Sequence, residues 1–364
     1  MKHIPQIQPY FDEKEMHHLK EVMESTFITE NSKTEEFLTE IRGLTKSNFA
    51  LAVANGTLAL VASLLAEGIG KEDEVIVPNL TFIASANAVR LVGATPVFCD
   101  VDYPSGCMTS KHCEELLSSK TRAIMPVHLY NNVADMADLL RFAKAHSLCV
   151  IEDAAEAFGA SRDGQHAGTF GDYGIFSFFA NKSITCGEGG VILTNEESRY
   201  TKLYRAKNHG RDRRGTFIHE HFGYNFCFTD LQAAIGVAQL EKLELIKQKK
   251  KLNFDTYQSA FDGKDNVQLI DPEPGVKSNY WFNNILVDNP TSVMENLATA
   301  GIETRRIFYP LHRQPCYENT EAASIEFPNS DRLYDHGLSL PSSAALTEED
   351  LQYVCQETLK ACKN

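Results

Sequence analysis

The sequence predicts an α/β protein, in which helices cover a mainly parallel β-sheet and a smaller α+β domain follows. Strand-like and helix-like segments alternate through the first two thirds of the 364-residue chain. The strand-like segments are nearly continuous in Val, Ile, Phe and Ala, as in strands buried on both faces of a parallel sheet. After about residue 245 this alternation ends. We therefore expect a large domain at residues 1–245, a small C-terminal domain at 246–364, and an N-terminal helix that packs with the small domain.

The expected elements follow in a regular order. Apolar runs predict strands at residues 49–54, 73–78, 95–102, 121–130, 148–155, 172–179 and 189–195. Helical spacing of apolar residues marks segments 57–69, 82–93, 112–119 and 134–147. Residues 229–261 read as one long helix or two, which lead out of the first domain. This order is that of repeated strand–helix–strand units, which place ligands at the carboxyl ends of the strands.

Charge and composition narrow the class of partner. The formal net charge is −14, and a field of that sign opposes non-specific binding to nucleic acid or to anionic lipid. The first residues contain no apolar signal-peptide core, and no stretch is apolar enough to cross a bilayer. The Cys and His residues lack metal-site spacing. We expect a cytoplasmic, soluble protein that needs no metal, nucleic acid or membrane, although a local basic pocket still allows an anionic substrate.

A glycine turn follows the first apolar strand. Asn55, Gly56 and Thr57 stand between that strand and a helical segment. Free N–H groups at the start of a helix, together with a hydroxyl group, form a site for an anion such as phosphate. The alternative is an ordinary helix cap made by Asn55 or Thr57.

A carboxylate ends the strand in "VIEDAAEAFGA". Burial of Asp153 at that position is costly unless a positive group meets it. Its functional interpretation is an anion that keeps a heteroaromatic ring nitrogen protonated, because a protonated pyridine is an electron sink. The alternative is a helix N-cap, since small residues follow.

A lysine stands in an apolar setting in "GIFSFFANKSITCGEGG". The residues before Lys182 are too apolar for an exposed loop, and the glycines after it allow a sharp bend. Desolvation lowers the pKa of a lysine, and the neutral amine can form a Schiff base with an aldehyde. The alternative, a solvent-exposed loop lysine, fits these flanks poorly.

One ligand satisfies all three segments. Gly56, Thr57 and Ser177 would hold a phosphate, Asp153 a ring nitrogen and Lys182 an aldehyde. Phe82, which follows another strand, would lie on the ring face, unless it is a core residue. An aromatic pyridinium aldehyde that carries a phosphate is pyridoxal 5′-phosphate (PLP).

These segments resemble those of a known enzyme family. The run "NGTLAL", "DEVIVPNLTFIASANAV", "GATPVFCDVD", "MPVHLY", "VIEDAAEAFGA", "FGDYGIFSFFANKSITCGEGG", "GYNFCFTDLQAAIGVAQL" and "YPLH" spans nearly the whole chain. It resembles the DegT/DnrJ/EryC1/StrS sugar aminotransferases, which have the PLP-dependent fold type I of aspartate aminotransferase. Glu156 and Phe178, where many relatives have Gln and His, bring it closest to the GDP-perosamine synthase-like C4 aminotransferases. The segment "FITENSKTEEF" resembles UDP- and dTDP-sugar enzymes instead, so the nucleotide stays open.

The resemblance also implies roles for single residues. Lys182 bonds the cofactor aldehyde and moves the proton, and Asp153 pairs with the pyridine nitrogen. Glu156 lies near the ring hydroxyl, where a carboxylate in place of an amide needs a shared proton. Phe82 stacks on the ring, and Gly56, Thr57 and Ser177 bind phosphate. Asn225 reaches the phosphate of the neighbouring subunit's cofactor, which makes the active unit a homodimer that shares its sites.

Candidates for substrate binding lie in the C-terminal part of the chain. Tyr309 and His312 stand in "YPLH" and Arg305 in "ETRRIFY". Arginines bind diphosphate or carboxylate groups well, and this holds also for Arg306, Arg211, Arg213 and Arg214. The alternative for all of these side chains is a structural or surface position.

The resemblance implies an amino-group transfer in two halves. Glutamate would leave as 2-oxoglutarate and convert the cofactor to pyridoxamine 5′-phosphate. The second half would aminate C4 of a 4-keto-6-deoxy sugar linked to a nucleoside diphosphate, for surface glycan or O-antigen synthesis. Two alternatives are a dehydratase of the same fold, whose relatives replace the lysine, typically with histidine, and a ligand sensor without catalysis. Lys182 and the lack of a DNA-binding segment argue against them.

Overall fold

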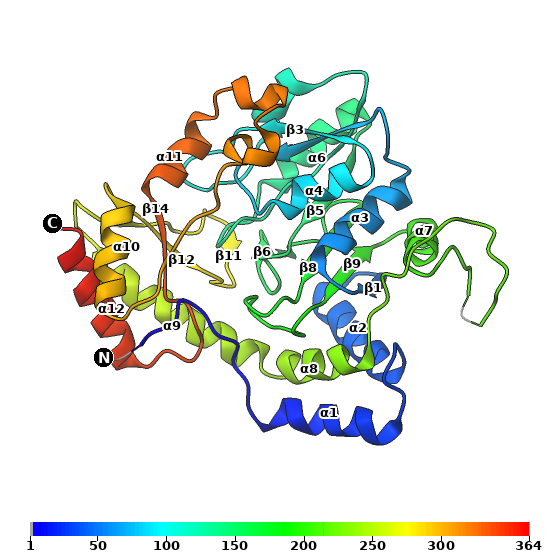
Figure 1. The fold of residues 1–364 in the computed structure, drawn as a ribbon, viewed down its shortest axis with the longest axis horizontal. Helices are drawn as coiled ribbons and strands as arrows, with labels where there is room; N and C mark the ends of the chain where they lie inside the picture. The colour runs from blue at the N-terminus through cyan, green and yellow to red at the C-terminus, as the bar shows by residue number, and fades with distance from the viewer. Residues whose placement is uncertain (1–2, 214, 364) are drawn as a thin grey trace.

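The α/β architecture is present in the computed structural model, which describes residues 3–213 and 215–363 (Figure 1). Its main sheet has seven strands in the order β1-β9-β8-β5-β4-β2-β3. Only β9 runs antiparallel to its neighbours, β1 and β8, while the other pairs are parallel. The strands are β1 (Phe49–Val53), β2 (Glu74–Pro78), β3 (Thr95–Cys99), β4 (Thr121–Ile124), β5 (Cys149–Asp153), β8 (Tyr173–Ser177) and β9 (Gly190–Thr194).

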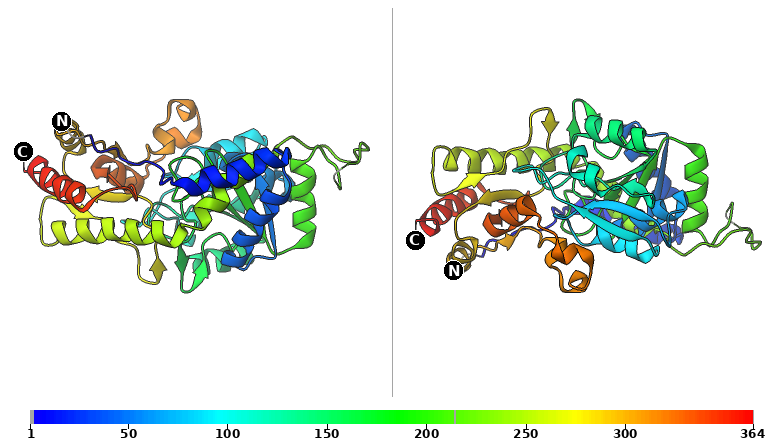
Figure 2. Two further views of the ribbon diagram at one scale, coloured as in Figure 1. Left: turned by 90° about the horizontal axis from the view of Figure 1, so that it is seen from below. Right: turned by 90° about the horizontal axis from the view of Figure 1, so that it is seen from above.

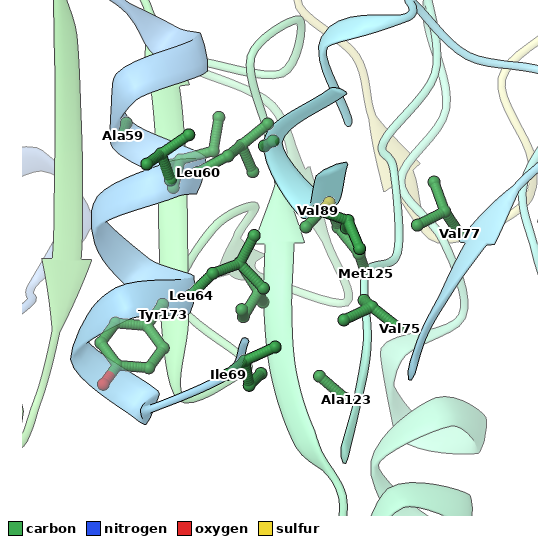
Figure 3. Packing of buried hydrophobic residues seen from close by; sticks show 14 of the residues in the cluster. Ala59, Leu60, Leu64, Ile69, Val75, Val77, Val89, Ala123, Met125 and Tyr173 are labelled. Atoms are coloured by element: carbon green, nitrogen blue, oxygen red, sulfur yellow. The ribbon is translucent and has the colours of Figure 1, made fainter. Parts of the chain in front are cut away.

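Helices cover both faces of this sheet. In β1, Leu51 and Val53 belong to the apolar core under α3, α4 and α7, while Ala50 and Ala52 belong to the core under α2 and α8. Both faces of the strand are therefore dry, as the unbroken apolar runs predict. Figure 3 shows Leu60 and Leu64 of α3 packed toward the sheet. These helices are α2 (Ser32–Thr45), α3 (Gly56–Glu67), α4 (Ala84–Leu91), α7 (Glu197–Lys207) and α8 (Asp230–Leu240), with α6 (Met136–His146) over β4 and β5.

A second sheet lies in the C-terminal part of the chain, away from α7 (Figure 2). Its strand order is β10-β12-β14-β13, and all pairs are antiparallel. These strands are β10 (Gln268–Leu269), β12 (Asn283–Leu286), β13 (Arg305–Arg306) and β14 (Gly337–Leu340), and the helices are α10 (Pro290–Thr299), α11 (Pro328–His336) and α12 (Glu348–Ala361). A small third sheet joins β11 (Val276–Lys277) to the hairpin of β6 (Ser161–Arg162) and β7 (Gln165–His166).

Helix α9 (Leu243–Phe261) links the two parts of the chain. Leu243 and Ile246 pack into the core of the main sheet, whereas Phe254 and Tyr257 pack into the core of the second sheet. The predicted boundary at residue 245 falls near the start of this helix and stays a prediction. At the other end of the chain, α1 (Glu13–Ser25) packs on α8, and Ile4 before it pairs with Ile302.

The structure refines two of the predicted helices. Residues 229–261 form two helices, α8 and α9, because the chain turns at Glu241 and Lys242. The helix expected at residues 112–119 is shorter and earlier than predicted. Only α5 (Ser110–Cys113) and a single 3₁₀ turn form there. No helix of the described residues has the length and apolarity needed to cross a membrane.

A buried carboxylate fixes the carboxyl end of β5. Glu152 accepts hydrogen bonds from the backbone N–H groups of Gly168, Phe170 and Gly171, at 2.8, 2.6 and 2.6 Å. A further bond joins it to His128 Nε2 at 2.9 Å. Since the N–H of Ala134 donates to His128 Nδ1, the histidine proton is on Nε2 and points at the carboxylate. The loop at 168–171 is thereby tied to the strand that ends in the next residue, Asp153.

We expect Glu152→Gln to destabilise the fold by about 3 kcal/mol, because an amide NH₂ group would face N–H donors in a dry site. Urea unfolding at neutral pH measures this difference. Glu295→Gln, on the exposed side of α10, serves as the matched control and should change stability by less than about 0.5 kcal/mol. Equal losses in the two variants would contradict the role given to Glu152.

Candidate active site

A cavity of about 340 Å³ lies at the carboxyl ends of β1, β5 and β8. Nine residues singled out from the sequence line it together: Asn55, Gly56, Thr57, Phe82, Asp153, Glu156, Ser177, Lys182 and Arg305. Trp281, Arg305 and Phe308 enter it from the C-terminal part of the chain. The amine, the strand-end acid and the glycine–threonine turn thus share one cavity, although 125 positions separate Lys182 from Thr57 in sequence.

One corner of the cavity suits a phosphate. Helix α3 begins at Gly56, and Asn55 caps it by accepting a hydrogen bond from the N–H of Leu58 at 2.9 Å. Asn55 is therefore a helix cap, which was the alternative interpretation of this turn. A cap at Asn55 is compatible with anion binding at the first N–H groups of the helix. A Cβ atom at position 56 would lie 2.9 Å from the Cβ of Ser177. Only glycine lets the Ser177 hydroxyl approach the start of the helix so closely.

Asp153 is held rigidly at the floor of the cavity. Ser85 Oγ donates to its Oδ2 at 2.7 Å, and the N–H of Ala155 donates to its Oδ1 at 3.2 Å. Burial raises the pKa of Asp153, although the bond from Ser85 and the charge of Lys182 oppose that rise. A protonated ring nitrogen placed against this carboxylate would supply the positive charge that its burial calls for.

Lys182 is largely buried, with 14% of its side chain exposed, as the apolar flanks predict. Its Nζ lies 3.8 Å from Oε1 of Glu156 and 4.1 Å from the centre of the Trp281 ring. Burial lowers the pKa of Lys182, while the charges of Glu156 and Asp153 act in the opposite direction. A larger fraction of neutral amine is therefore available near neutral pH than an exposed lysine would have.

Glu156 is the carboxylate that contacts this amine, and the charge of each group affects the pKa of the other. The N–H of Tyr130 donates to its Oε2 at 2.9 Å. Burial raises the pKa of Glu156 to about 7, against the effect of Lys182 and of that hydrogen bond. Its carboxyl group is thus poised to hold or release a proton near neutral pH, as the shared proton predicted from the sequence requires.

Three predicted residues lie outside the cavity within this chain. His312 is hydrogen-bonded to Asn79 through Nδ1, and Tyr309 packs edge-on against Tyr334. Asn225 is exposed and pairs with Asn208 at the base of the segment that follows α7. Whether any of them contacts substrate or a partner's cofactor stays a prediction.

The other predicted arginines differ in their surroundings. Arg306 donates to the backbone carbonyls of Tyr334 and Gly337, which is a structural position. Arg211 donates to Asn208 Oδ1 at 2.7 Å, next to Asn225. Arg214 lies outside the described residues.

Trp281 and Asn181 were not predicted from the sequence. Trp281 stands in "NYWFNNILV", an apolar segment that reads as a strand, and only its rarity as the single tryptophan marks it. Asn181 lines the cavity with a buried Oδ1 that has no hydrogen-bond partner among the described residues. In the sequence, the neighbouring Lys182 marks this segment as functional, but no pattern singles out the amide of Asn181.

The fold and these residues define a PLP-dependent aminotransferase of fold type I. The residues fit the cofactor: a helix N-terminus and Ser177 face each other across a space that only Gly56 leaves open. Asp153 and the desolvated amine of Lys182 lie in the same cavity, and Phe82 lines its wall. No group of three or more described His, Cys, Asp or Glu residues could hold a metal ion.

The chain belongs to the DegT/DnrJ/EryC1/StrS aminotransferase family, whose model matches residues 9–359. It is 38% identical over 360 residues to GDP-perosamine synthase of Escherichia coli O157:H7, covering 98% of each chain. It is 36% identical to the GDP-perosamine synthase of Vibrio cholerae, covering 97% of each. Its fold is also similar to the PMP form of the putative sugar aminotransferase Spr1654 from Streptococcus pneumoniae, with a TM-score of 0.93, 26% identity, and coverage of 100% of this chain and 98% of that one. These findings confirm the family predicted from the sequence.

Glu156→Gln should change how stability depends on pH. The pKa of Glu156 is raised from 4.5 to about 7 in the fold, so its stabilising contribution is complete below pH 4.5 and is lost as the pH rises through 7. The glutamine side chain does not titrate, so the variant does not lose stability in this pH range through residue 156. Relative to the wild type, the variant should therefore gain about 1–3 kcal/mol between pH 5.5 and pH 8.

Urea unfolding at one protein concentration and both pH values measures this gain. Glu295→Gln, with its exposed side chain, provides the control and should show no gain. A stability difference between Glu156→Gln and the wild type that does not vary with pH would contradict the raised pKa.

Proposed function

We propose that this enzyme moves an amino group from L-glutamate to C4 of a nucleotide-linked 4-keto-6-deoxy sugar. The product would be a 4-amino-4,6-dideoxy sugar nucleotide for a surface glycan such as O-antigen. The observation that carries the proposal is the meeting of Lys182, Asp153 and Gly56 in one cavity. The names of the relatives, GDP-perosamine synthases, support C4 as the position and guanosine diphosphate as the nucleotide.

Lys182 is the group that moves the proton. When bound, PLP supplies an electron sink that lets the amino group change carrier. The Lys182 amine takes a proton from one carbon and returns it to another, so it must lie near both and exchange protons near neutral pH. Burial lowers its pKa toward that range. Its single contact with a carboxylate, at 3.8 Å, is too long to lock it in place.

The other residues orient the reactants. Asp153 would pair with the protonated ring nitrogen of the cofactor, and Gly56 with Ser177 would hold its phosphate. Glu156 would lie near the ring hydroxyl, where its raised pKa lets it hold a proton. The apolar walls contributed by Phe82, Trp281 and Phe308 exclude water from the cavity.

Arg305 supports binding of an anion. It is the one arginine among the described cavity-lining residues, and its guanidinium lies 5.3 Å from the centre of the Phe282 ring. A guanidinium held over an aromatic ring keeps its N–H groups free for a carboxylate or diphosphate. Arg305 would therefore receive the donor's carboxylate or the sugar's diphosphate, with Tyr309 and His312 farther along the same segment.

A homodimer would complete the site. Residues 209–213 and 215–224 project from the body of the chain after α7 (Figures 1 and 2) and expose Phe217, Ile218 and Phe222. Large apolar side chains on a projecting segment favour burial against another molecule. A second copy of this chain, placed so that Asn225 reaches its cofactor phosphate, would bury them, and a cytoplasmic dimer is the proposed state.

The dehydratase alternative is not favoured. Such relatives lack the Schiff-base lysine, whereas this chain has Lys182 inside the cavity. A substrate panel tests the assignment: GDP-, UDP- and dTDP-linked 4-keto-6-deoxy sugars, each with glutamate, analysed by mass spectrometry. We expect one sugar to gain nitrogen and 2-oxoglutarate to appear, and Lys182→Ala to abolish both. Loss of oxygen without gain of nitrogen would favour dehydration, and a fully active Lys182→Ala enzyme would end the proposal.

Mixing two inactive variants tests the shared site. Asn225→Ala should weaken the partner's phosphate site, and Lys182→Ala should disable its own. After unfolding and refolding at equal concentration, half of the dimers would be mixed, and each would have one intact site. Activity should return to about a quarter of the wild-type value. No recovery, with refolding verified by circular dichroism, would place Asn225 outside the partner's site.

A further inference from the structure

A segment from the C-terminal part of the chain holds both neighbours of Lys182. Asn279 Nδ2 donates to the Glu156 carbonyl at 2.7 Å and to Ser183 Oγ at 3.3 Å. Trp281 Nε1 donates to the carbonyl of Asn181 at 2.7 Å. The residues before and after the reactive lysine are therefore both bonded to the segment Asn279–Trp281, about a hundred residues away in sequence.

Several contacts fix this segment. Tyr280 has a positive φ of 51°, which aromatic residues rarely adopt and which surrounding contacts must maintain. The Trp281 carbonyl accepts a hydrogen bond from Lys250 Nζ at 3.2 Å, and the same ammonium donates to the carbonyl of Ser342 at 2.7 Å. Trp281 is buried, and its ring is stacked with that of Tyr130 at 6.1 Å. The indole therefore has a single orientation, with its face toward Lys182.

We propose that Trp281 is a positioning residue for Lys182, and that its indole face is where the amine rests whenever it is not bonded to the cofactor. An aromatic face attracts an ammonium group but accepts no proton and imposes no directional hydrogen bond. The amine thus stays inside the cavity, can still transfer its proton, and can move away from the indole ring. Nζ already lies 4.1 Å from the ring centre, and no hydrogen bond joins it to another described residue.

The indole acts together with the charges around the amine. Glu156 and Asp153 favour its ammonium form, and Arg305 disfavours it. Since an aromatic face also favours the ammonium form, removing it should lower the pKa of Lys182 and impair the placement of its amine. This inference rests on the aminotransferase activity and not on the identity of the sugar, so its tests use no sugar.

The first test uses Trp281 as its own probe. Because it is the only tryptophan in the chain, intrinsic emission reports this site alone. The enzyme in its pyridoxamine phosphate form, in which Lys182 is not bonded to the cofactor, should show a change in tryptophan emission as the amine titrates. Lys182→Met, loaded with the same cofactor, should lack that change. The same titration in both proteins would overturn the proposal.

The second test measures the half-reaction with glutamate alone, followed by cofactor absorbance across pH. In Trp281→Leu, the acid limb of the rate should shift down by roughly 0.5–1 pH unit. The plateau of the rate should fall about tenfold, because the amine of Lys182 is no longer held in position. The KM for glutamate should change less than twofold. Trp281→Phe, which keeps a ring, should show smaller effects and remains informative if the leucine variant does not fold. A folded variant with the wild-type pH profile and plateau would overturn the proposal.

Discussion

Burial of one amine beside two carboxylates is the constraint on which the rest of the site depends. Lys182, Asp153 and Glu156 line the same cavity, where the two acidic residues are 5% exposed and the lysine side chain is 14% exposed. Desolvation favours the neutral form of each group, whereas the attraction between the amine and the two carboxylates favours their charged forms. The balance leaves a lysine with a lowered pKa and a Glu156 whose pKa is about 7. A site that must give and take protons near neutral pH needs such a balance, which exposed groups would not reach.

The scaffold stabilises this arrangement by supplying hydrogen bonds to both carboxylates. Next to Asp153, Glu152 accepts hydrogen bonds from three backbone N–H groups and from His128, and these bonds fix the end of the strand. Asp153 itself is held by Ser85. A parallel sheet brings the carboxyl ends of β5 and β8 to one edge, and the helix that follows β1 begins there. The fold class thus determines where the site lies, and the buried polar network determines its geometry.

The sequence was sufficient for the fold class and for the part of the site that lies on the sheet. Buried strands leave unbroken apolar runs, and Gly56, Asp153 and Lys182 each break such a run or follow its end. The contribution of Trp281 could not be predicted, because it depends on how a distant segment folds back across the cavity.

Local patterns also misjudged helix lengths. Residues 112–119 have helical spacing, but only a short helix and a 3₁₀ turn form there. Residues 229–261, which read as one helix or two, form two helices. Tertiary contacts decide such boundaries, because short helices gain most of their stability from packing. The same reason explains why the placement of His312, which bonds to Asn79 just after the distant strand β2, could not be inferred from its motif.

The charge balance of the cavity also explains how a chain with a net charge of −14 can accept an anionic substrate. The start of α3 lies at the cavity, where its N–H groups would bind the cofactor's phosphate, and Arg305 lines the same cavity. Glu156 would repel a second anion if it were always ionised, but burial raises its pKa to about 7. Near neutral pH a glutamate at this position is therefore partly protonated and repels an incoming anion less than a permanently charged carboxylate would.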